Sequence, residues 1–238
     1  MMESTVGVVQ HISGAEAFAR HFAVSRETVQ RLETYAALLA QWQQTINLVA
    51  PGTLADIWSR HFADSAQLFR LIPHGARRLV DLGSGAGFPG LVLAIMAGDD
   101  QRGGREGASS TAPSHGLRVT LVESDQRKAA FLREVSRKLG IAVDIELARI
   151  EIISTRVNVE RFDVITSRAL APLPRLLEMS RPFFESATVA LFLKGRDVES
   201  EVEDARKLWS FSLELVPSMT NAEARVAVIR DVRSNREG

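Results

Sequence analysis

The stretch VDLGSGAGFPG at 80–90 constrains the fold more than any other part of the sequence. The short apolar run RLVDLG (78–83) leads into it, and the apolar run LVLAIMA (91–97) follows it. Glycine accepts positive φ values and lets the backbone approach a ligand closely, so this spacing predicts a tight turn between a buried strand and a helix. A strand–turn–helix of this kind is where α/β proteins bind nucleotides.

The rest of the chain alternates between strand and helix patterns. Strands are predicted at 118–124, 141–147, 162–169 and 188–195, with helices at 126–140, near 173–185 and at 197–209. Two further strands, 211–217 and 225–231, lie close enough together to form a hairpin. This order predicts an α/β fold, a doubly wound and mostly parallel Rossmann-like sheet with an antiparallel hairpin at its edge.

Residues 16–72, before the glycine turn, read as helical and carry no strand signal. We divide the chain into an N-terminal tail (1–24), a helical cap (25–72) and an α/β domain (73–238). Ser25 is the expected N-cap of the first cap helix, and Thr53 that of a second one after Pro51-Gly52. Within the domain, the Gly- and Ser-rich stretch 98–116 predicts a flexible surface insertion, with a functional lid as the alternative.

Composition excludes several classes of protein. The 238 residues contain no cysteine, which excludes disulfides, Cys-based zinc sites and Cys nucleophiles, and we expect no metal. The formal net charge is zero, so any surface for nucleic acid must be local. The N-terminus lacks the pattern of a signal peptide and no apolar run is long enough to span a bilayer, so we expect a cytoplasmic protein without a membrane partner.

The spacing of the glycines narrows the choice of ligand. A dinucleotide fingerprint, G-x-G-x-x-G, would need glycine at position 88, where the chain has Phe88. The observed G-x-G-x-G spacing favours the S-adenosylmethionine turn of Rossmann-like methyltransferases. Glu123 ends the second strand, where an acidic side chain can bind the ribose hydroxyls, and Asp81 is expected to orient the amino-acid end of the cofactor. A turn needed only for packing, and an NAD site, are the alternatives.

The methyl acceptor is constrained by what the chain lacks. Methylation at C5 of a pyrimidine uses a Cys nucleophile, and the chain has none. Exocyclic amines are handled by an Asn/Asp-Pro-Pro-aromatic turn after the fourth strand, where this chain has Thr166-Ser167-Arg168-Ala169. A ring nitrogen such as guanine N7 carries a free lone pair at neutral pH and needs no general base, so it remains compatible with the sequence.

Several segments carry a family resemblance. VDLGSGAGFPGLVLAI, NLVA (47–50), SRHFADS (59–65), LVESDQRKAAFL, ARIEII (148–153), TSRALAPL and FLKG together resemble the motifs of the small-subunit (16S) rRNA guanine-N7 methyltransferases, the RsmG/GidB family. The resemblance covers about residues 25–230. It implies S-adenosylmethionine as cofactor and 16S rRNA in the small ribosomal subunit as partner. The insertion at 98–116 looks longer than in the family, and Ala148 stands where serine is common.

The resemblance also implies roles for individual residues. Gly83 and Phe88 would contact the cofactor, with Gly85 and Gly87 in the same turn. Ile150 and Glu151 would lie at its adenine, and Arg168 would line the mouth shared by cofactor and substrate.

Basic residues supply the remaining candidates. Arg168 and Lys194 are expected to act at the reacting centre by shaping its electrostatics. Candidate RNA-binding residues are Arg60, His61, Arg127, Lys128 and Lys194, since phosphate contacts from such residues would position rRNA. A packing histidine and a solvated helix face are the structural alternatives. A monomer is expected, and rival functions are methylation of a small molecule or protein, or RNA binding without catalysis.

Overall fold

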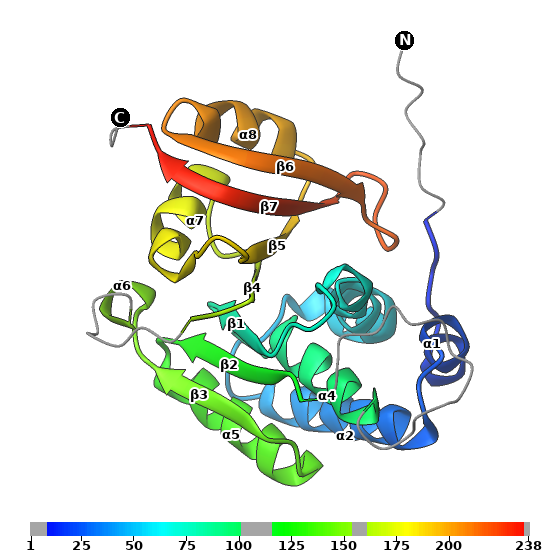
Figure 1. The fold of residues 1–238 in the computed structure, drawn as a ribbon. Helices are drawn as coiled ribbons and strands as arrows, with labels where there is room; N and C mark the ends of the chain where they lie inside the picture. The colour runs from blue at the N-terminus through cyan, green and yellow to red at the C-terminus, as the bar shows by residue number, and fades with distance from the viewer. Residues whose placement is uncertain (1–8, 101–115, 154–160, 236–238) are drawn as a thin grey trace.

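A computed structural model describes residues 9–100, 116–153 and 161–235, and it contains one seven-stranded sheet (Figure 1). The strands are β1 (Arg78–Leu82), β2 (Arg118–Glu123), β3 (Val143–Leu147), β4 (Val164–Arg168), β5 (Val189–Lys194), β6 (Trp209–Pro217) and β7 (Arg225–Ser234), in the spatial order β3-β2-β1-β4-β5-β7-β6. The first five are parallel, and β7 pairs antiparallel with both β5 and β6. The predicted parallel sheet and edge hairpin are confirmed.

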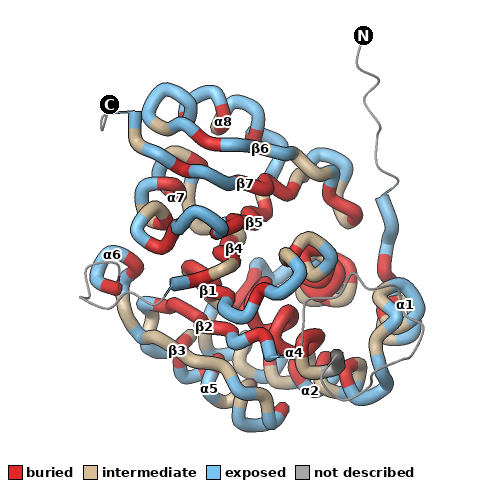
Figure 2. Tube along the Cα trace, in the orientation of Figure 1, coloured by how far each residue is buried: buried red, intermediate tan, exposed pale blue. Residues whose placement is uncertain are grey.

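Helices cover both faces of this sheet. The helices α4 (Gly90–Asp100) and α5 (Gln126–Leu139) pack on one face, and α7 (Leu173–Ser180) and α8 (Val198–Arg206) on the other, with the short α6 (Ile150–Ile153) beside α7. Alternate residues of a strand point to opposite faces, so Leu79 joins the core under α4 while Val80 and Leu82 join the core under α7. Figure 2 shows the central strands buried along most of their length.

The cap lies outside the α4–α5 layer. Its main helix, α2 (Arg26–Trp42), begins as predicted at Ser25, whose hydroxyl oxygen accepts a hydrogen bond from Thr28 N at 3.1 Å. The helix packs on α4 and α5 through a fully buried row that includes Leu32, Tyr35 and Leu39. The Tyr35 hydroxyl donates to the Ala86 carbonyl, so α2 is bonded directly to the glycine turn.

The predicted helical region begins with α1 (Ala15–Phe22), within the stretch that we assigned to a tail, and its Phe18 is completely buried against the cap. One expectation for this region is corrected. The second cap helix is broken into η1 (Pro51–Asp56), the π-helical η2 (Trp58–Ala63), α3 (Asp64–Ala66) and η3 (Phe69–Leu71). Thr53 is not its N-cap, since its hydroxyl donates to the Ala50 carbonyl at 2.7 Å.

The predicted insertion at 98–116 lies mostly outside the described residues, which end at 100 and resume at 116. Within the described ranges, every helix is too short or too polar to cross a membrane. The same ranges contain no group of three or more His, Asp or Glu side chains placed to hold a metal ion.

Candidate active site: two cavities that share a wall

Two cavities open at the carboxyl end of the parallel strands. The larger has a volume of about 670 Å³ and the smaller about 480 Å³. Ala169 and Leu170, which directly follow β4, line both of them. Ala169 takes a left-handed conformation with φ of 51°, which turns the chain sharply at this point. The two residues therefore form a wall between neighbouring binding spaces.

The smaller cavity unites five of the predicted cofactor residues, Gly83, Gly85, Glu123, Ile150 and Glu151, with Lys128 beside them. Glu123 is 7% exposed. Its Oε2 accepts from Gly85 N at 2.8 Å and its Oε1 from Asp125 N at 2.7 Å. Because a carboxylate oxygen can accept two hydrogen bonds, both oxygens retain capacity for a ribose diol.

The shape and chemistry of this cavity fit an adenosyl group. Gly85 has φ of 57°, and a Cβ built on it would meet nothing nearer than the Gly83 carbonyl oxygen at 3.9 Å. The missing side chain thus leaves room on the floor of the cavity. Val122 and Ile150 give apolar walls for a flat base, and Glu123 supplies the polar group for a sugar. The predicted roles of Glu123 and Ile150 stay proposals that this geometry supports.

Three predicted cofactor residues, Asp81, Gly87 and Phe88, line neither cavity. A Cβ on Gly87, where φ is 96°, would collide with Leu91 and with the Tyr35 hydroxyl, so this glycine serves packing. The Phe88 ring is buried and stacks on Tyr35 with 5.4 Å between ring centroids. Phe88 thus packs between the turn and the cap, and its expected contact with a cofactor stays a prediction.

Asp81 organises the turn from below. Its carboxylate accepts hydrogen bonds from Gly90 N at 3.2 Å and from Thr166 Oγ1 at 2.8 Å. Complete burial raises the pKa of Asp81 to about 6, although these hydrogen bonds oppose the shift. The Asp81 side chain is completely buried and holds the turn in shape, and its expected role at the amino-acid end of the cofactor stays a prediction.

The raised pKa of Asp81 predicts an unusual pH dependence of stability. Folded protein binds a proton at this carboxyl below about pH 6, whereas the unfolded chain does so only near 3.8. The wild type should therefore gain stability relative to Asp81→Asn as pH falls from 6 to 4, by about 2–3 kcal/mol at most. Urea unfolding of both proteins at several pH values measures the difference. A difference that stays constant or moves the other way would show that Asp81 is ionised in the folded protein.

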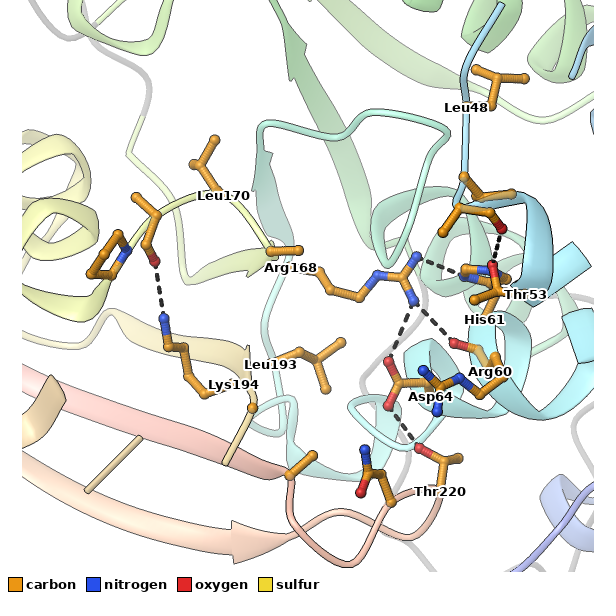
Figure 3. A pocket seen from close by; sticks show the side chains of 18 of the residues that line it. Leu48, Thr53, Arg60, His61, Asp64, Arg168, Leu170, Leu193, Lys194 and Thr220 are labelled. Carbon is orange, nitrogen blue, oxygen red and sulfur yellow. Dashed lines mark hydrogen bonds and ion pairs between the residues drawn. The ribbon is translucent and has the colours of Figure 1, made fainter. Parts of the chain in front are cut away.

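The larger cavity contains four predicted residues, Arg60, His61, Arg168 and Lys194. Figure 3 shows the Arg168 guanidinium reaching from β4 to the cap. Its Nη2 donates to His61 Nδ1 at 2.8 Å, and its Nη1 donates to the Arg60 carbonyl at 3.1 Å and lies 3.4 Å from Asp64 Oδ2. Asp64 Oδ1 in turn accepts from Thr220 Oγ1 at 2.8 Å. Arg168 thus fastens the end of β4 to the π-helix and, through Asp64, to the β6–β7 loop.

His61 holds Arg168 as a neutral imidazole. Because arginine can only donate, His61 Nδ1 must accept, and the proton sits on Nε2, which donates to Thr53 Oγ1 at 2.8 Å. Burial, reinforced by Arg168 and Arg60, lowers the pKa of His61 to about 3. The ring is 6% exposed and stacks on Phe88 at 4.8 Å. His61 therefore positions Arg168, as expected of a packing histidine, and its contact with RNA stays a prediction.

Lys194 is also held in place. Its Nζ donates to the Ala171 carbonyl at 2.9 Å and forms an ion pair with Glu201 Oε2 at 2.5 Å, with 9% of its side chain exposed. Each of the two cations expected at the reacting centre is thus paired with a carboxylate, Asp64 or Glu201. The site presents two neutralised pairs instead of a strongly positive field.

The remaining RNA candidates lie at different places. Arg127 is outside both cavities, with 72% of its side chain exposed and its Nη2 3.8 Å from Asp125 Oδ2. Lys128 is one residue further along α5 and was predicted only as an RNA-binding residue. It lines the smaller cavity. Arg60 is exposed at the rim of the larger cavity.

Sequence reasoning did not single out several residues of the larger cavity, among them Glu201, Thr220 and Asn221. Glu201 belongs to a helix with several glutamates, and nothing in the sequence marks the one that meets Lys194. Thr220 and Asn221 lie in the β6–β7 loop, which the sequence identifies only as a hairpin connection.

Comparisons with known proteins agree with this architecture. Residues 28–229 match the GidB family model, described as rRNA small subunit methyltransferase G. The chain is 48% identical to ribosomal RNA small subunit methyltransferase G of Paramagnetospirillum magneticum, with 94% of this chain and 98% of the relative covered. It is 42% identical to the protein of the same name from Parvibaculum lavamentivorans, with coverages of 97% and 95%.

Solved structures with the same fold include a mutant of MtNAS in complex with S-adenosylmethionine, with a TM-score of 0.53, 15% identity and coverages of 91% and 83%. The O-methyltransferase from Bacillus cereus in complex with SAH gives a TM-score of 0.52, 14% identity and coverages of 87% and 91%. These likenesses establish a Rossmann-like methyltransferase fold, and the sequence matches establish the family. The chain belongs to the GidB family, the rRNA small subunit methyltransferases G.

Proposed function

We propose that this chain transfers a methyl group from S-adenosylmethionine to N7 of a guanine in 16S rRNA. The observation that carries the proposal is the pair of cavities with the shared wall at Ala169 and Leu170. The smaller cavity fits the adenosyl group, so the larger one is left for the acceptor base. Membership of the GidB family supports small-subunit rRNA as the source of that base.

Methyl transfer to guanine N7 requires that the two reactants be aligned, and it requires no general base. Bound S-adenosylmethionine supplies the methyl group, and its sulfur keeps the electron pair of the broken C–S bond. Guanine N7 offers its own lone pair, gains the methyl group and leaves the ring with a positive charge, so no proton has to be removed. Asp64 and Glu201 are both engaged by cations, which suits a site that aligns two reactants and excludes water.

The acceptor and its atom can be tested together. Chemical cleavage at N7-methylguanine is mapped in small-subunit rRNA from cells with and without the gene. We expect one cleavage to disappear without the gene and to return with the wild-type protein. An unchanged pattern would contradict the assignment of rRNA and N7. Transfer to a small molecule or a protein in the absence of RNA would support the rival enzyme class.

Exposed arginines should control how rRNA binding depends on salt. Arg60 lies at the rim of the acceptor cavity and Arg127 at the start of α5, where they can contact phosphates. Arg60→Ala and Arg127→Ala should each reduce the slope of log K against log salt by about 1. Arg137→Ala is the matched control, because this residue lies in the last turn of the same helix and bonds Glu134 at 2.8 and 3.0 Å. Equal slopes for all variants, measured by filter binding, would remove Arg60 and Arg127 from the RNA surface.

We further propose that the protein acts as a monomer in the cytoplasm, where a ribosomal substrate would be found. Light scattering of the purified protein measures the oligomeric state.

A further inference from the structure

Lys194 and Glu201 form a fixed donor–acceptor pair on the wall of the larger cavity. Lys194 Nζ donates to Glu201 Oε2 at 2.5 Å and to the Ala171 carbonyl at 2.9 Å, which leaves one ammonium hydrogen. Glu201 Oε2 also accepts from Leu173 N at 2.6 Å. Among the described residues, Glu201 Oε1 has no hydrogen-bond partner, although the side chain is only 23% exposed. The pair therefore offers one spare donor next to one spare acceptor.

Purines differ at the edge that such a pair would meet. Guanine has the acceptor O6 beside the donors N1–H and N2–H, whereas adenine has the N6 amino donor beside the acceptor N1. An ammonium next to a carboxylate is complementary to guanine at both positions. With adenine, the ammonium of Lys194 would face the N6 amino group, donor against donor, and the carboxylate of Glu201 would face N1, acceptor against acceptor. These polar groups would stay unpaired in a partly buried wall.

The reaction fixes which way the base points. For methyl transfer, N7 must face the smaller cavity across Ala169 and Leu170. Turning the base over about an axis through N7 moves the O6–N1 edge away from the pair and does not exchange its donor and acceptor. The order of groups along the edge is thus read in a single orientation.

We propose that the Lys194–Glu201 ion pair selects guanine, with Lys194 Nζ donating to O6 and Glu201 Oε1 accepting from N1–H. This inference rests on the proposed function. Glu201 also has a role in the rate, because methylation at N7 leaves the ring positive and makes N1–H a stronger donor. A carboxylate at N1–H therefore binds the transition state more tightly than the ground state.

The test combines altered substrates with an altered enzyme. Small-subunit rRNA is assembled by ligation with guanine, inosine or 2,6-diaminopurine at the modified position. Inosine retains O6, N1–H and N7, whereas diaminopurine retains N7 and exchanges the O6 and N1–H groups. The wild type should methylate inosine within about tenfold of guanine and diaminopurine about 100-fold more slowly.

The variant Glu201→Gln retains the size of the side chain and an acceptor for Leu173 N but loses the charge. We expect kcat for guanine to fall about 10- to 100-fold and the preference over diaminopurine to shrink. The Kd values for S-adenosylmethionine and rRNA should change less than about threefold, because phosphate contacts dominate RNA affinity. Glu203→Gln, an exposed change on the same helix, is the matched control and should behave as wild type.

The outcomes separate the two proposals. If wild-type protein leaves guanine-containing rRNA unmethylated at N7, the proposed function is wrong and the selection of guanine is wrong with it. If guanine is methylated but diaminopurine reacts equally fast, or Glu201→Gln preserves both rate and preference, only the role of the pair is overturned. If Glu201→Gln fails to fold, the rates of the wild type with the three RNAs still test whether the pair selects guanine.

Discussion

Replacing Arg168 by alanine is expected to lower kcat/KM for rRNA methylation about 100- to 1000-fold. The guanidinium bonds His61 and the Arg60 carbonyl, pairs with Asp64, and lies 4.9 Å from the centroid of the Phe88 ring. Without the guanidinium, the neighbouring wall residue Ala169 is no longer held in position, and Asp64 loses its cationic partner. Misplacing an acceptor by about 1 Å costs about 100-fold in rate, and a lost charged contact adds to this.

The same variant tests which cavity Arg168 serves. Arg168 lines the larger cavity, proposed for the acceptor, and is absent from the residues that line the smaller cavity, proposed for the cofactor, although sequence resemblance assigned it to both. The Kd of S-adenosylmethionine, measured by calorimetry, should therefore change less than about threefold. Arg168→Lys should not restore the rate, because an ammonium cannot reproduce the planar set of bonds.

Arg137→Ala is the control for a lost surface arginine and should remain fully active. A large loss of S-adenosylmethionine affinity in Arg168→Ala would return this residue to the cofactor site. A rate close to that of wild type would exclude it from the reacting centre.

Placing a methyl group on Gly85 should weaken S-adenosylmethionine binding at least tenfold, with methylation falling in parallel at low cofactor concentration. The residue has φ of 57° and lines the cofactor cavity, so the Cβ of Gly85→Ala occupies space that the adenosyl group needs. The left-handed backbone alone costs about 1–2 kcal/mol of stability with any side chain.

Gly140→Ala separates the two effects. Gly140 ends α5 with φ of 62°, and a Cβ there would meet nothing within 4 Å. Both variants should lose about the same stability on thermal unfolding, but only Gly85→Ala should lose cofactor affinity. If the two variants bind S-adenosylmethionine equally well, the smaller cavity is not the cofactor site.

The arrangement of the sheet followed from the sequence because its signals are local. Buried parallel strands appear as short apolar runs, and α5 is delimited by Asp125 at its start and Gly140 at its end. The closeness of the last two strands predicts a hairpin, and β6 and β7 form one. The broken second cap helix was missed because its apolar pattern is helical while its backbone changes between 3₁₀, π and α turns.

Within the site, the sequence identified residues at strand ends better than it identified which way they point. Gly83, Glu123 and Ile150 line the expected cavity because the carboxyl ends of β1, β2 and β3 define its place. Asp81 and Phe88 belong to the same motif but face the core, since Tyr35 and His61 of the cap pack behind the turn. That direction depends on contacts between segments far apart in sequence, which a local motif does not encode.

The shared wall at Ala169 and Leu170 has a consequence for inhibitor design. Because one short segment separates the two cavities, the proposed function predicts that a single compound carrying an adenosyl group and a purine on a short linker will bind in both. Joining the two parts makes the second binding event intramolecular and raises its effective concentration. Leu170, whose Cδ1 would lie 2.6 Å from a Cβ on Gly83, determines the path that such a linker must take.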